Sequence, residues 1–463
     1  MSERTPPRPR AVLVSVQLPE VSDEEHAGNL AELVRLVDTL GYDVVAEVSQ
    51  RREMLSKSLV LGEGKLKELA AITGGRGYVP SQAPARTDKA RLRREEEEGP
   101  DDDEGLEPED DVEDDDPERP KRPKIVIVDH DLTPNQARNL EQSTGAQVLD
   151  RTGVIVEIFH RHARSREARL QVELARLAYV APRLREAGGP SERQAGRGAG
   201  DSALELDRRR IRDRMAEIRR ELAAIQRDQG GRRNLRHGTP TAALVGYTNA
   251  GKSSLMRALT GSEVLVADQL FATLDTTVRA LHPPSHPRVL VSDTVGFIKK
   301  LPHDLVASFR STLDEARNAS LLLFVVDASD PTFRAQYEVT RAVLREIEAD
   351  QAPSLLLLNK IDRVDAEARE ALRAEFPDAV QLSSRDPADV AALRATIIAR
   401  VTADMQEEEV FVPWASHAVV AAFHAQAQVV RETHEDAGTR LVVRAAPEVL
   451  ERLKAALPAE AAD

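Results

Sequence analysis

The feature that most constrains the fold of this chain is a glycine-rich segment of eight residues, 246–253, directly after an apolar run at Ala242–Val245. The apolar run is typical of a buried strand, and Ser254–Leu259 is expected to form a helix. Glycines between a strand and a helix let backbone N–H groups close around phosphate oxygens, where the helix dipole favours negative charge. The sequence therefore predicts a phosphate-binding loop, with an ordinary glycine-rich helix cap as the alternative. Its residues are Gly246, Tyr247, Thr248, Asn249, Ala250, Gly251, Lys252 and Ser253.

Two side chains of this loop have expected chemical roles. In the pattern Gly-x-x-x-x-Gly-Lys-Ser the lysine reaches the β- and γ-phosphates of a nucleoside triphosphate, and the serine hydroxyl binds Mg²⁺. We therefore predict that Lys252 acts in catalysis and that Ser253 is a metal ligand.

Three later segments each follow a predicted strand, and they predict guanine as the base. They read Asp293-Thr294-Val295-Gly296, Asn359-Lys360-Ile361-Asp362 and Ser383-Ser384-Arg385. Asp293 can hold Mg²⁺ through water, and the Gly296 amide can sense the γ-phosphate. The Asp362 carboxylate can accept from guanine N1–H and the 2-amino group together, a donor pair that adenine lacks. Alone, Asn-Lys-x-Asp is more often a helix cap, but its place after a phosphate-binding loop and a strand favours guanine.

A second protein ligand for Mg²⁺ is expected between the phosphate-binding loop and Asp293. The segment Phe271-Ala272-Thr273-Leu274-Asp275 offers Thr273 for this role. Spacing alone leaves Thr276 and Thr277 as alternatives.

The net charge of −14 comes from one block of the chain. Between Glu95 and Glu118, 17 of 24 residues are acidic and none is basic; without them the net charge would be +3. Such a block cannot bury apolar surface, so we expect a disordered insertion. A solvated linker and an electrostatic competitor of RNA both remain open as its role.

The basic residues are concentrated in residues 161–236, which contain 20 Arg, no Lys and 11 acidic residues. Arginine suits bidentate phosphate contacts and base stacking. Apolar residues spaced by four and three in Arg161–Leu184 and in Leu204–Arg227 predict two helices that pack antiparallel as a coiled-coil hairpin. The loop between them carries Arg193 and Arg197, which would contact RNA or would simply balance nearby acids at a solvated tip.

The predicted fold class is α/β. A P-loop G domain with a doubly wound parallel sheet is preceded by a small α/β domain and the antiparallel helical hairpin, and is followed by a short α+β domain. The predicted bounds are 1–92 and 123–160 for the N-terminal domain, 93–122 for the insertion, 161–236 for the hairpin, 240–405 for the G domain and 406–463 for the C-terminal domain. The chain has no cysteine, and its longest later apolar run, Leu321–Val326, is too short to span a bilayer. We expect a cytoplasmic protein without a membrane span.

These residues resemble the HflX-type GTPases of the translation-factor-related class over nearly the whole chain. The resemblance is carried by 129–136, 138–141, 149–153, 170–175, 207–211, 296–298 and 301–306 as well as by the nucleotide motifs. It assigns Phe271–Asp275 to switch I, which favours Thr273 as a metal ligand. It also implies a monomer that binds the large (50S) ribosomal subunit and its rRNA, and that rescues or splits stalled or idle ribosomes. The chain departs from the family at Gly198-Ala199-Gly200-Asp201, where relatives usually have a proline and a glutamate.

The residue after the Asp-x-x-Gly motif is Phe297, where many small GTPases have a water-orienting glutamine. We therefore expect slow hydrolysis without a partner; the alternative is that Phe297 packs on the sheet while another residue orients water. Two other functions remain open at this point. They are a P-loop ATPase acting on RNA, and an RNA-binding adaptor that does not hydrolyse nucleotide.

Overall fold

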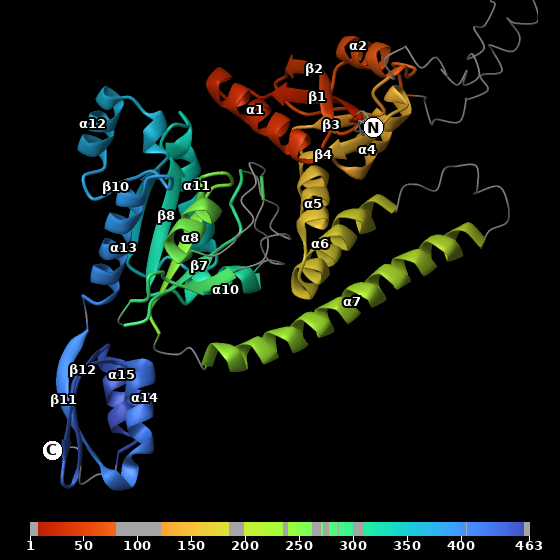
Figure 1. Ribbon diagram of the computed structural model, residues 1–463. Helices are drawn as coiled ribbons and strands as arrows, with labels where there is room; N and C mark the ends of the chain where they lie inside the picture. The colour runs from red at the N-terminus through yellow and green to blue at the C-terminus, as the bar shows by residue number, and fades with distance from the viewer. Residues whose placement is uncertain are drawn as a thin grey trace, which may run out of the picture. The chain divides into compact units, whose positions relative to one another are not determined.

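The computed structural model describes residues 8–79, 122–184, 199–234, 239–261, 270–271, 277–285, 287–299, 310–403 and 405–457. The chain divides into two compact units between Ile155 and Val156. Figure 1 labels the helices and strands of both units. Within the described ranges, no helix combines the length and the apolar character needed to cross a lipid bilayer.

The N-terminal unit contains a four-stranded parallel sheet with the strand order β2-β1-β3-β4. Central strand β1 is almost wholly buried, as expected of a parallel strand that is covered on both faces. Side-chain caps begin two of the helices: Ser22 accepts from the Glu25 amide, and Thr133 forms a reciprocal pair with Gln136. The elements are β1 (Arg10–Gln17), α1 (Asp23–Thr39), β2 (Asp43–Arg51), α2 (Glu63–Thr73), β3 (Ile125–Val128), α4 (Pro134–Thr144) and β4 (Gln147–Asp150).

A helix that the sequence did not predict, α5 (Arg151–His162), follows β4 without a loop. Asp150 begins it, because its carboxylate accepts from the Gly153 amide at 2.8 Å. The Arg151 guanidinium is buried and donates to Asp129 at 2.8 Å and to Glu32 at 2.7 Å, so two buried carboxylates share one buried cation. The helix ends before Ala163, and a new helix begins at Arg166. The prediction of one helix from Arg161 to Leu184 is therefore wrong at its first turn.

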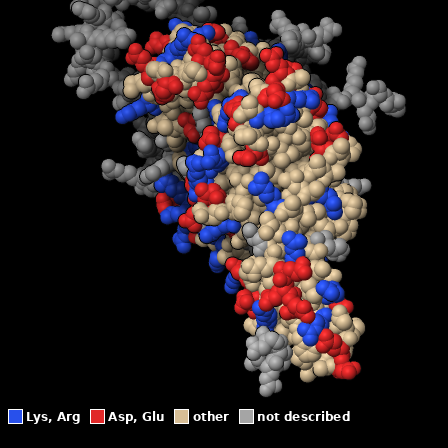
Figure 2. Space-filling model, turned by 90° about the vertical axis from the view of Figure 1, so that its left-hand side faces the viewer, with Lys and Arg blue, Asp and Glu red and all other residues tan. Residues whose placement is uncertain are grey.

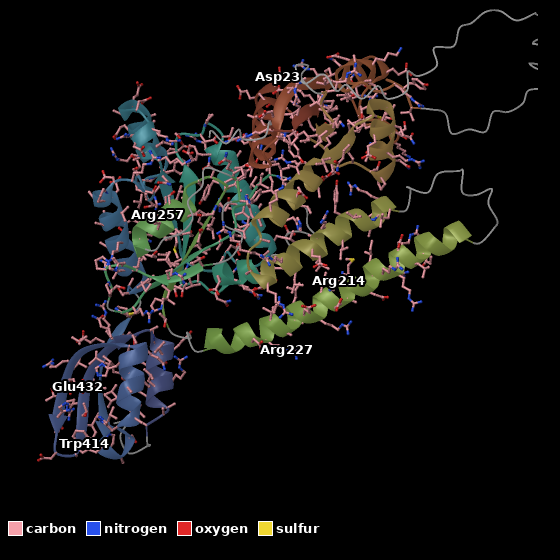
Figure 3. The ribbon with its side chains drawn as sticks, turned by 45° about the vertical axis from the view of Figure 1, so that its right-hand side comes forward. Asp23, Arg214, Arg227, Arg257, Trp414 and Glu432 are labelled. Carbon is pink, nitrogen blue, oxygen red and sulfur yellow. The ribbon has the colours of Figure 1, made fainter. Side chains whose placement is uncertain are left out.

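Helices α6 (Arg166–Leu184) and α7 (Ala199–Asn234) pack against each other through Leu170, Ile218 and Leu222. Arg166 pairs with Glu221, and Glu173, seven residues later, pairs with Arg214, seven residues earlier than Glu221. This reversed order confirms the antiparallel hairpin. Figure 3 labels Arg214 and Arg227 on α7. The loop arginines Arg193 and Arg197 lie outside the described residues, as does the insertion up to residue 121.

The G domain has a six-stranded sheet with the order β10-β9-β8-β5-β7-β6. All pairs are parallel except β6 with β7, so the predicted parallel sheet gains one antiparallel edge strand. The elements are β5 (Thr241–Gly246), α8 (Lys252–Thr260), β6 (Thr277–Ala280), β7 (Leu290–Asp293), α10 (Arg310–Arg317), β8 (Leu321–Asp327), α11 (Phe333–Glu346), β9 (Ser354–Asn359), η2 (Ile361–Arg363), α12 (Ala366–Glu375), β10 (Val380–Gln381) and α13 (Pro387–Val401).

The C-terminal residues form a three-stranded antiparallel sheet, β11-β13-β12, covered by two helices. Trp414 is the only tryptophan of the chain and is 46% exposed, with its ring 5.5 Å from that of His417 and 6.0 Å from that of His434. The elements are β11 (Gln406–Pro413), η3 (Trp414–Ser416), α14 (Ala418–Gln426), β12 (Gln428–Glu435), β13 (Gly438–Ala445) and α15 (Pro447–Lys454). Acidic and basic side chains are interspersed over the face of the molecule that Figure 2 shows.

Candidate nucleotide-binding site

Residues 246–253 form a tight loop between β5 and α8, and its two glycines are required by sterics. A Cβ on Gly246 would lie 2.2 Å from the Val325 carbonyl oxygen of β8. Gly251 has φ +97°, and a Cβ there would lie 2.2 Å from the side-chain nitrogen of Asn359. A larger residue at either position would push the loop away from its neighbours. The close approach of the backbone is thus set by two glycines that are distant in sequence from the atoms they contact.

The Lys252 side chain is buried in this loop. Its ammonium group donates to the Gly246 carbonyl at 2.9 Å and to the Tyr247 carbonyl at 2.8 Å. Burial lowers the pKa of Lys252 to about 8, while the nearby Asp293 carboxylate opposes that shift. An amine held in this way has lost most of its hydration, so it gains strongly from an anion that enters the loop.

The Asp-x-x-Gly segment lies beside the phosphate-binding loop. Ser253 Oγ donates to Asp293 Oδ2 at 2.9 Å, which brings the two predicted magnesium-binding oxygens together. Thr294 Oγ1 donates to the Leu244 carbonyl at 2.7 Å and fixes the segment on β5. A Cβ on Gly296 would lie 2.9 Å from Thr248 Cα and 3.0 Å from Lys252 Nζ. Gly296 and Lys252 are therefore neighbours across the site.

The Asn-Lys-x-Asp segment contacts both the phosphate-binding loop and residues at or after the ends of strands β8 and β10. Asn359 Nδ2 donates to the Ala250 carbonyl at 2.8 Å, and its Oδ1 accepts from the Ser384 amide at 3.1 Å. Lys360 Nζ donates to the Asn249 carbonyl at 2.8 Å and pairs with Asp327 at 2.7 Å. Four segments of the chain, at 249–250, 327, 359–360 and 384, are thus joined by direct hydrogen bonds.

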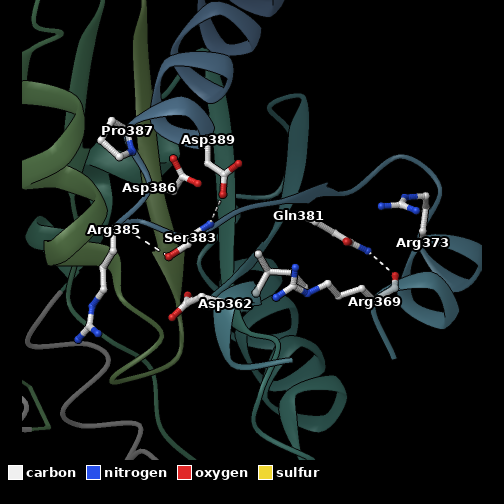
Figure 4. A pocket seen from close by; sticks show the side chains of 10 residues that line it. Asp362, Arg369, Arg373, Gln381, Ser383, Arg385, Asp386, Pro387 and Asp389 are labelled. Atoms are coloured by element: carbon white, nitrogen blue, oxygen red, sulfur yellow. Dashed lines mark hydrogen bonds between the residues drawn. The ribbon is translucent and has the colours of Figure 1, made fainter. Parts of the chain in front are cut away.

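Asp362 lies in a hollow of about 630 Å³ whose lining includes Ser383, Arg385 and Asp389 (Figure 4). The Ser383 side chain hydrogen-bonds Asp362 and lowers the pKa of its carboxyl below the ordinary value; the charge of Arg385 lowers it further. Asp389 accepts from the Ser383 amide at 2.8 Å and fixes that residue. An ionised acceptor that lines this hollow has the charge that suits the N1–H and 2-amino donors of guanine.

Phe297 is buried beside the loop rather than facing solvent. Its amide donates to the Gly246 carbonyl at 3.1 Å, and its carbonyl accepts from the Thr248 amide at 2.8 Å. The Tyr247 hydroxyl accepts from the Lys299 amide at 2.7 Å and continues this pairing. The side chain at the position of the missing glutamine is therefore part of the packing.

Of the predicted switch I residues, the structure describes Phe271; Ala272, Thr273, Leu274 and Asp275 lie outside the described residues. Phe271 is buried and has φ +58°, an unusual backbone conformation for a bulky residue. Its ring meets that of Phe159 edge to face, with centroids 4.6 Å apart. His162 hydrogen-bonds the Phe271 backbone, and burial lowers the pKa of His162.

Sequence reasoning missed Asp327, Asp389, Phe159 and His162. Asp327 is the last residue of strand β8 as Asp293 is of β7, so its position at the carboxyl end of a strand could have indicated a site residue. Nothing in the sequence indicated the contacts of Phe159 and His162, because these contacts depend on how α5 packs.

A phosphate-binding loop, an Asp-x-x-Gly segment and an Asn-Lys-x-Asp segment at one edge of a doubly wound sheet define a P-loop GTP-binding protein. Family models agree: residues 241–360 match "50S ribosome-binding GTPase", 162–236 match "GTP-binding GTPase Middle Region", and 27–78 with 117–160 match "GTP-binding GTPase N-terminal".

The chain is 60% identical to GTPase HflX of Gluconacetobacter diazotrophicus, over 99% of this chain and 100% of the relative. It is 34% identical to GTPase HflX of Escherichia coli, over 93% of this chain and 92% of the relative. A solved GTP-binding protein of Sulfolobus solfataricus in complex with GDP is 23% identical, covers 85% of this chain and 99% of its own, and has a TM-score of 0.41. The chain belongs to the HflX family of GTPases, and it binds and hydrolyses GTP.

Proposed function

We propose that this GTPase is a cytoplasmic, monomeric switch that binds the large (50S) ribosomal subunit and its rRNA through the Arg-rich hairpin. It acts in translation, in the rescue or splitting of stalled or idle ribosomes or in ribosome biogenesis. The observation that carries the proposal is the pairing of a GTP site with a long antiparallel hairpin whose basic residues are all arginine. The printed description of the matched G-domain family, a 50S ribosome-binding GTPase, supports the same partner.

The charge pattern of α7 supports RNA as the ligand of the hairpin. Near the loop, Arg208, Arg210 and Arg212 pair with acidic residues of the same helix. Farther from the loop, Arg220 and Arg227 are exposed and have no ion-pair partner among the described residues. Guanidinium groups without a carboxylate partner remain available for phosphate oxygens.

At the nucleotide, the proposed roles follow the hydrogen-bond geometry. The amides of 246–253 and the Lys252 ammonium hold the β- and γ-phosphates, and the Gly296 amide meets the γ-phosphate. Asp362 accepts from the guanine edge, and the backbone of 383–385 meets O6. Asn359 and Lys360 hold the loop and the base site together through their contacts with Ala250 and Asn249. Phe271, Ala272, Thr273, Leu274 and Asp275 complete the site as switch I.

Mg²⁺ fits the residues that are present. Ser253 and Asp293 bring a hydroxyl and a carboxylate oxygen together, and hard oxygens of this kind are the ligands that Mg²⁺ prefers. Ser253 and Thr273 would hold the ion directly and Asp293 through water. When bound, the ion neutralises charge on the β- and γ-phosphates.

Hydrolysis is proposed to be slow without the ribosome. The Phe297 ring is buried and apolar, so it cannot orient a water molecule. The ribosome would supply the missing group or order switch I and the residues after Gly296.

Sedimentation with ribosomes tests the partner. Binding to the 50S subunit in a non-hydrolysable GTP analogue should exceed binding in GDP, and ribosomes should raise the hydrolysis rate. The variant Arg193→Ala with Arg197→Ala should weaken sedimentation and lower the log–log salt slope by up to about two. Arg210→Ala with Arg212→Ala is the matched control, because these arginines are already paired with acids. Equal sedimentation of the tip variant and the control at every salt concentration would refute the tip contact.

A further inference from the structure

The residues that follow the Asp-x-x-Gly motif are held on the phosphate-binding loop by a short parallel ladder. The Phe297 amide donates to the Gly246 carbonyl at 3.1 Å, and its carbonyl accepts from the Thr248 amide at 2.8 Å. Tyr247 and Phe297 thus form a parallel bridge. Two residues later, the Lys299 amide donates to the Tyr247 hydroxyl at 2.7 Å. Of these three bonds, the one at Lys299 depends on a side chain.

The ladder continues the pairing of β5 with β7 after an interruption. Leu244 lies opposite Asp293 in the sheet, and Tyr247 lies opposite Phe297 in the bridge. Between these two pairs the chain advances three residues on the side of β5 and four on the side of β7. The extra residue makes residues 294–296 a bulge in the ladder. Both ends of this bulge are therefore fixed to β5 and its loop.

Gly296 is the last residue of the bulge and lies beside the buried lysine of the loop. A Cβ on Gly296 would lie 2.9 Å from Thr248 Cα and 3.0 Å from Lys252 Nζ. The Lys252 ammonium donates in turn to the Tyr247 carbonyl at 2.8 Å. Tyr247 therefore contacts the lysine through its carbonyl and the residues after Gly296 through its hydroxyl. Tyr247 is 5% exposed, which limits competition from water for that hydroxyl.

We propose that Tyr247 is a positioning residue that favours GTP over GDP, because its hydroxyl helps to hold the Gly296 amide where it meets the γ-phosphate. The proposal rests on the proposed contact between Gly296 and the γ-phosphate. An amide that is already in place needs no ordering when GTP binds, and such preorganisation favours the triphosphate. GDP has no γ-phosphate, so loss of the hydroxyl should leave GDP binding unaffected.

The test compares Tyr247→Phe with Tyr337→Phe in the full chain with Mg²⁺ present. Each change removes one phenolic oxygen, and Tyr337 lies in α11 of the same domain, where its ring packs against Phe324. In Tyr247→Phe, the affinity for a non-hydrolysable GTP analogue should fall about threefold to tenfold, as expected for one hydrogen bond. Its GDP affinity should stay within about twofold of wild type, which also shows that the variant folds.

The control variant Tyr337→Phe should keep both affinities. An equal loss for the two nucleotides in Tyr247→Phe would mean that the hydroxyl supports the loop as a whole, and the positioning role would be wrong. An unchanged or increased affinity for the GTP analogue would overturn it as well.

Gly296→Ala tests the γ-phosphate contact by itself, because a methyl group there would push residue 296 away from Thr248 and Lys252. This variant should lose most of its preference for the GTP analogue and retain GDP binding. If it keeps the preference, the proposed Gly296 contact is wrong, and the role of Tyr247 is wrong too. If it loses the preference and Tyr247→Phe does not, the role of Tyr247 alone is wrong. In the double variant Tyr247→Phe should add nothing, since both changes act on one contact.

Hydrogen exchange measures the same coupling without a variant. In the wild-type protein, the Lys299 amide should exchange with solvent about threefold to tenfold more slowly with the GTP analogue than with GDP, because coupling between two sites is reciprocal. Equal exchange rates at Lys299 in the two complexes would contradict the proposal.

Discussion

The N-terminal unit and the G domain each contain a parallel sheet with charged residues at the carboxyl ends of its strands, but they use the charges differently. In the N-terminal sheet, Arg151 is neutralised by Asp129 and Glu32, all three buried. In the G domain, Lys252 is buried against two carbonyl groups, and its pKa is lowered to about 8. The first arrangement satisfies its charges internally and stabilises the fold. The second leaves a poorly solvated cation whose best partner is a ligand.

The comparison predicts opposite results for removing the two cations. Lys252→Met should lower hydrolysis on the order of 10³-fold or more, since the phosphates lose their buried counter-charge. The nucleotide-free protein should at the same time become more stable, by about 1–3 kcal/mol, because a buried amine is replaced by an apolar chain. Single-turnover hydrolysis and denaturant unfolding without nucleotide measure the two effects. A destabilised, active variant would contradict both parts.

Arg151→Met should do the reverse. It leaves Asp129 and Glu32 buried without their counter-charge, at a cost of about 3–5 kcal/mol in unfolding free energy. GTP hydrolysis per folded molecule should be unchanged at low temperature. The free energy comes from denaturant unfolding and the rate from a phosphate-release assay. A stable variant with reduced hydrolysis would mean that this ion cluster serves the nucleotide site.

Asp362→Asn extends the comparison to an anion of the G domain, because the Asp362 carboxylate, like the Lys252 ammonium, is proposed to pair with the nucleotide. The change should cost about 2–4 kcal/mol in GTP affinity through loss of a charged double acceptor. Xanthine nucleotide should become the preferred ligand, since the amide offers a donor to the 2-oxo group. Competition binding measures both. GTP affinity equal to wild type would remove Asp362 from base recognition.

The smallest effect is a pH dependence. Below pH 8 Lys252 is already charged without nucleotide; above pH 8 it is neutral, and binding an anionic nucleotide requires it to take up a proton. GDP affinity should therefore fall as pH rises above about 8, by up to about tenfold per pH unit. Titrations from neutral pH upward should show this slope in wild type and lose it in Lys252→Met, whereas titration of guanine itself is common to both. Parallel curves would show that Lys252 stays charged in the empty loop.

Much of the fold could be predicted because its signals are local. Strands β1, β5 and β9 are short apolar runs, and the phosphate-binding loop follows one of them directly. Helix α5 could not be predicted, since Val154, Ile155, Val156, Ile158 and Phe159 are all buried and Glu157 is the one polar residue among them. A run with five apolar residues in six positions shows little helical periodicity, and its β-branched residues favour a strand. Strand β6 was missed because its residues, Thr277, Val278, Arg279 and Ala280, do not form a continuous apolar run.

For the nucleotide site, too, local features could be predicted from the sequence and long-range contacts could not. The motif residues could be identified because each motif is contiguous and follows a strand. The contacts that position them join distant parts of the chain, such as Lys360 with Asp327 or Phe159 with Phe271. No local pattern encodes such pairs, because they exist only once the sheet and α5 have packed.

The lone tryptophan has a practical consequence. Because Trp414 is the only indole and lies in the C-terminal domain, intrinsic tryptophan fluorescence reports on that domain and on nothing else in the chain. Its ring lies beside the rings of His417 and His434, so a displacement of either histidine changes the surroundings of the indole. The protein thus carries a built-in optical probe, free of label, for whatever approaches or unfolds its last three strands.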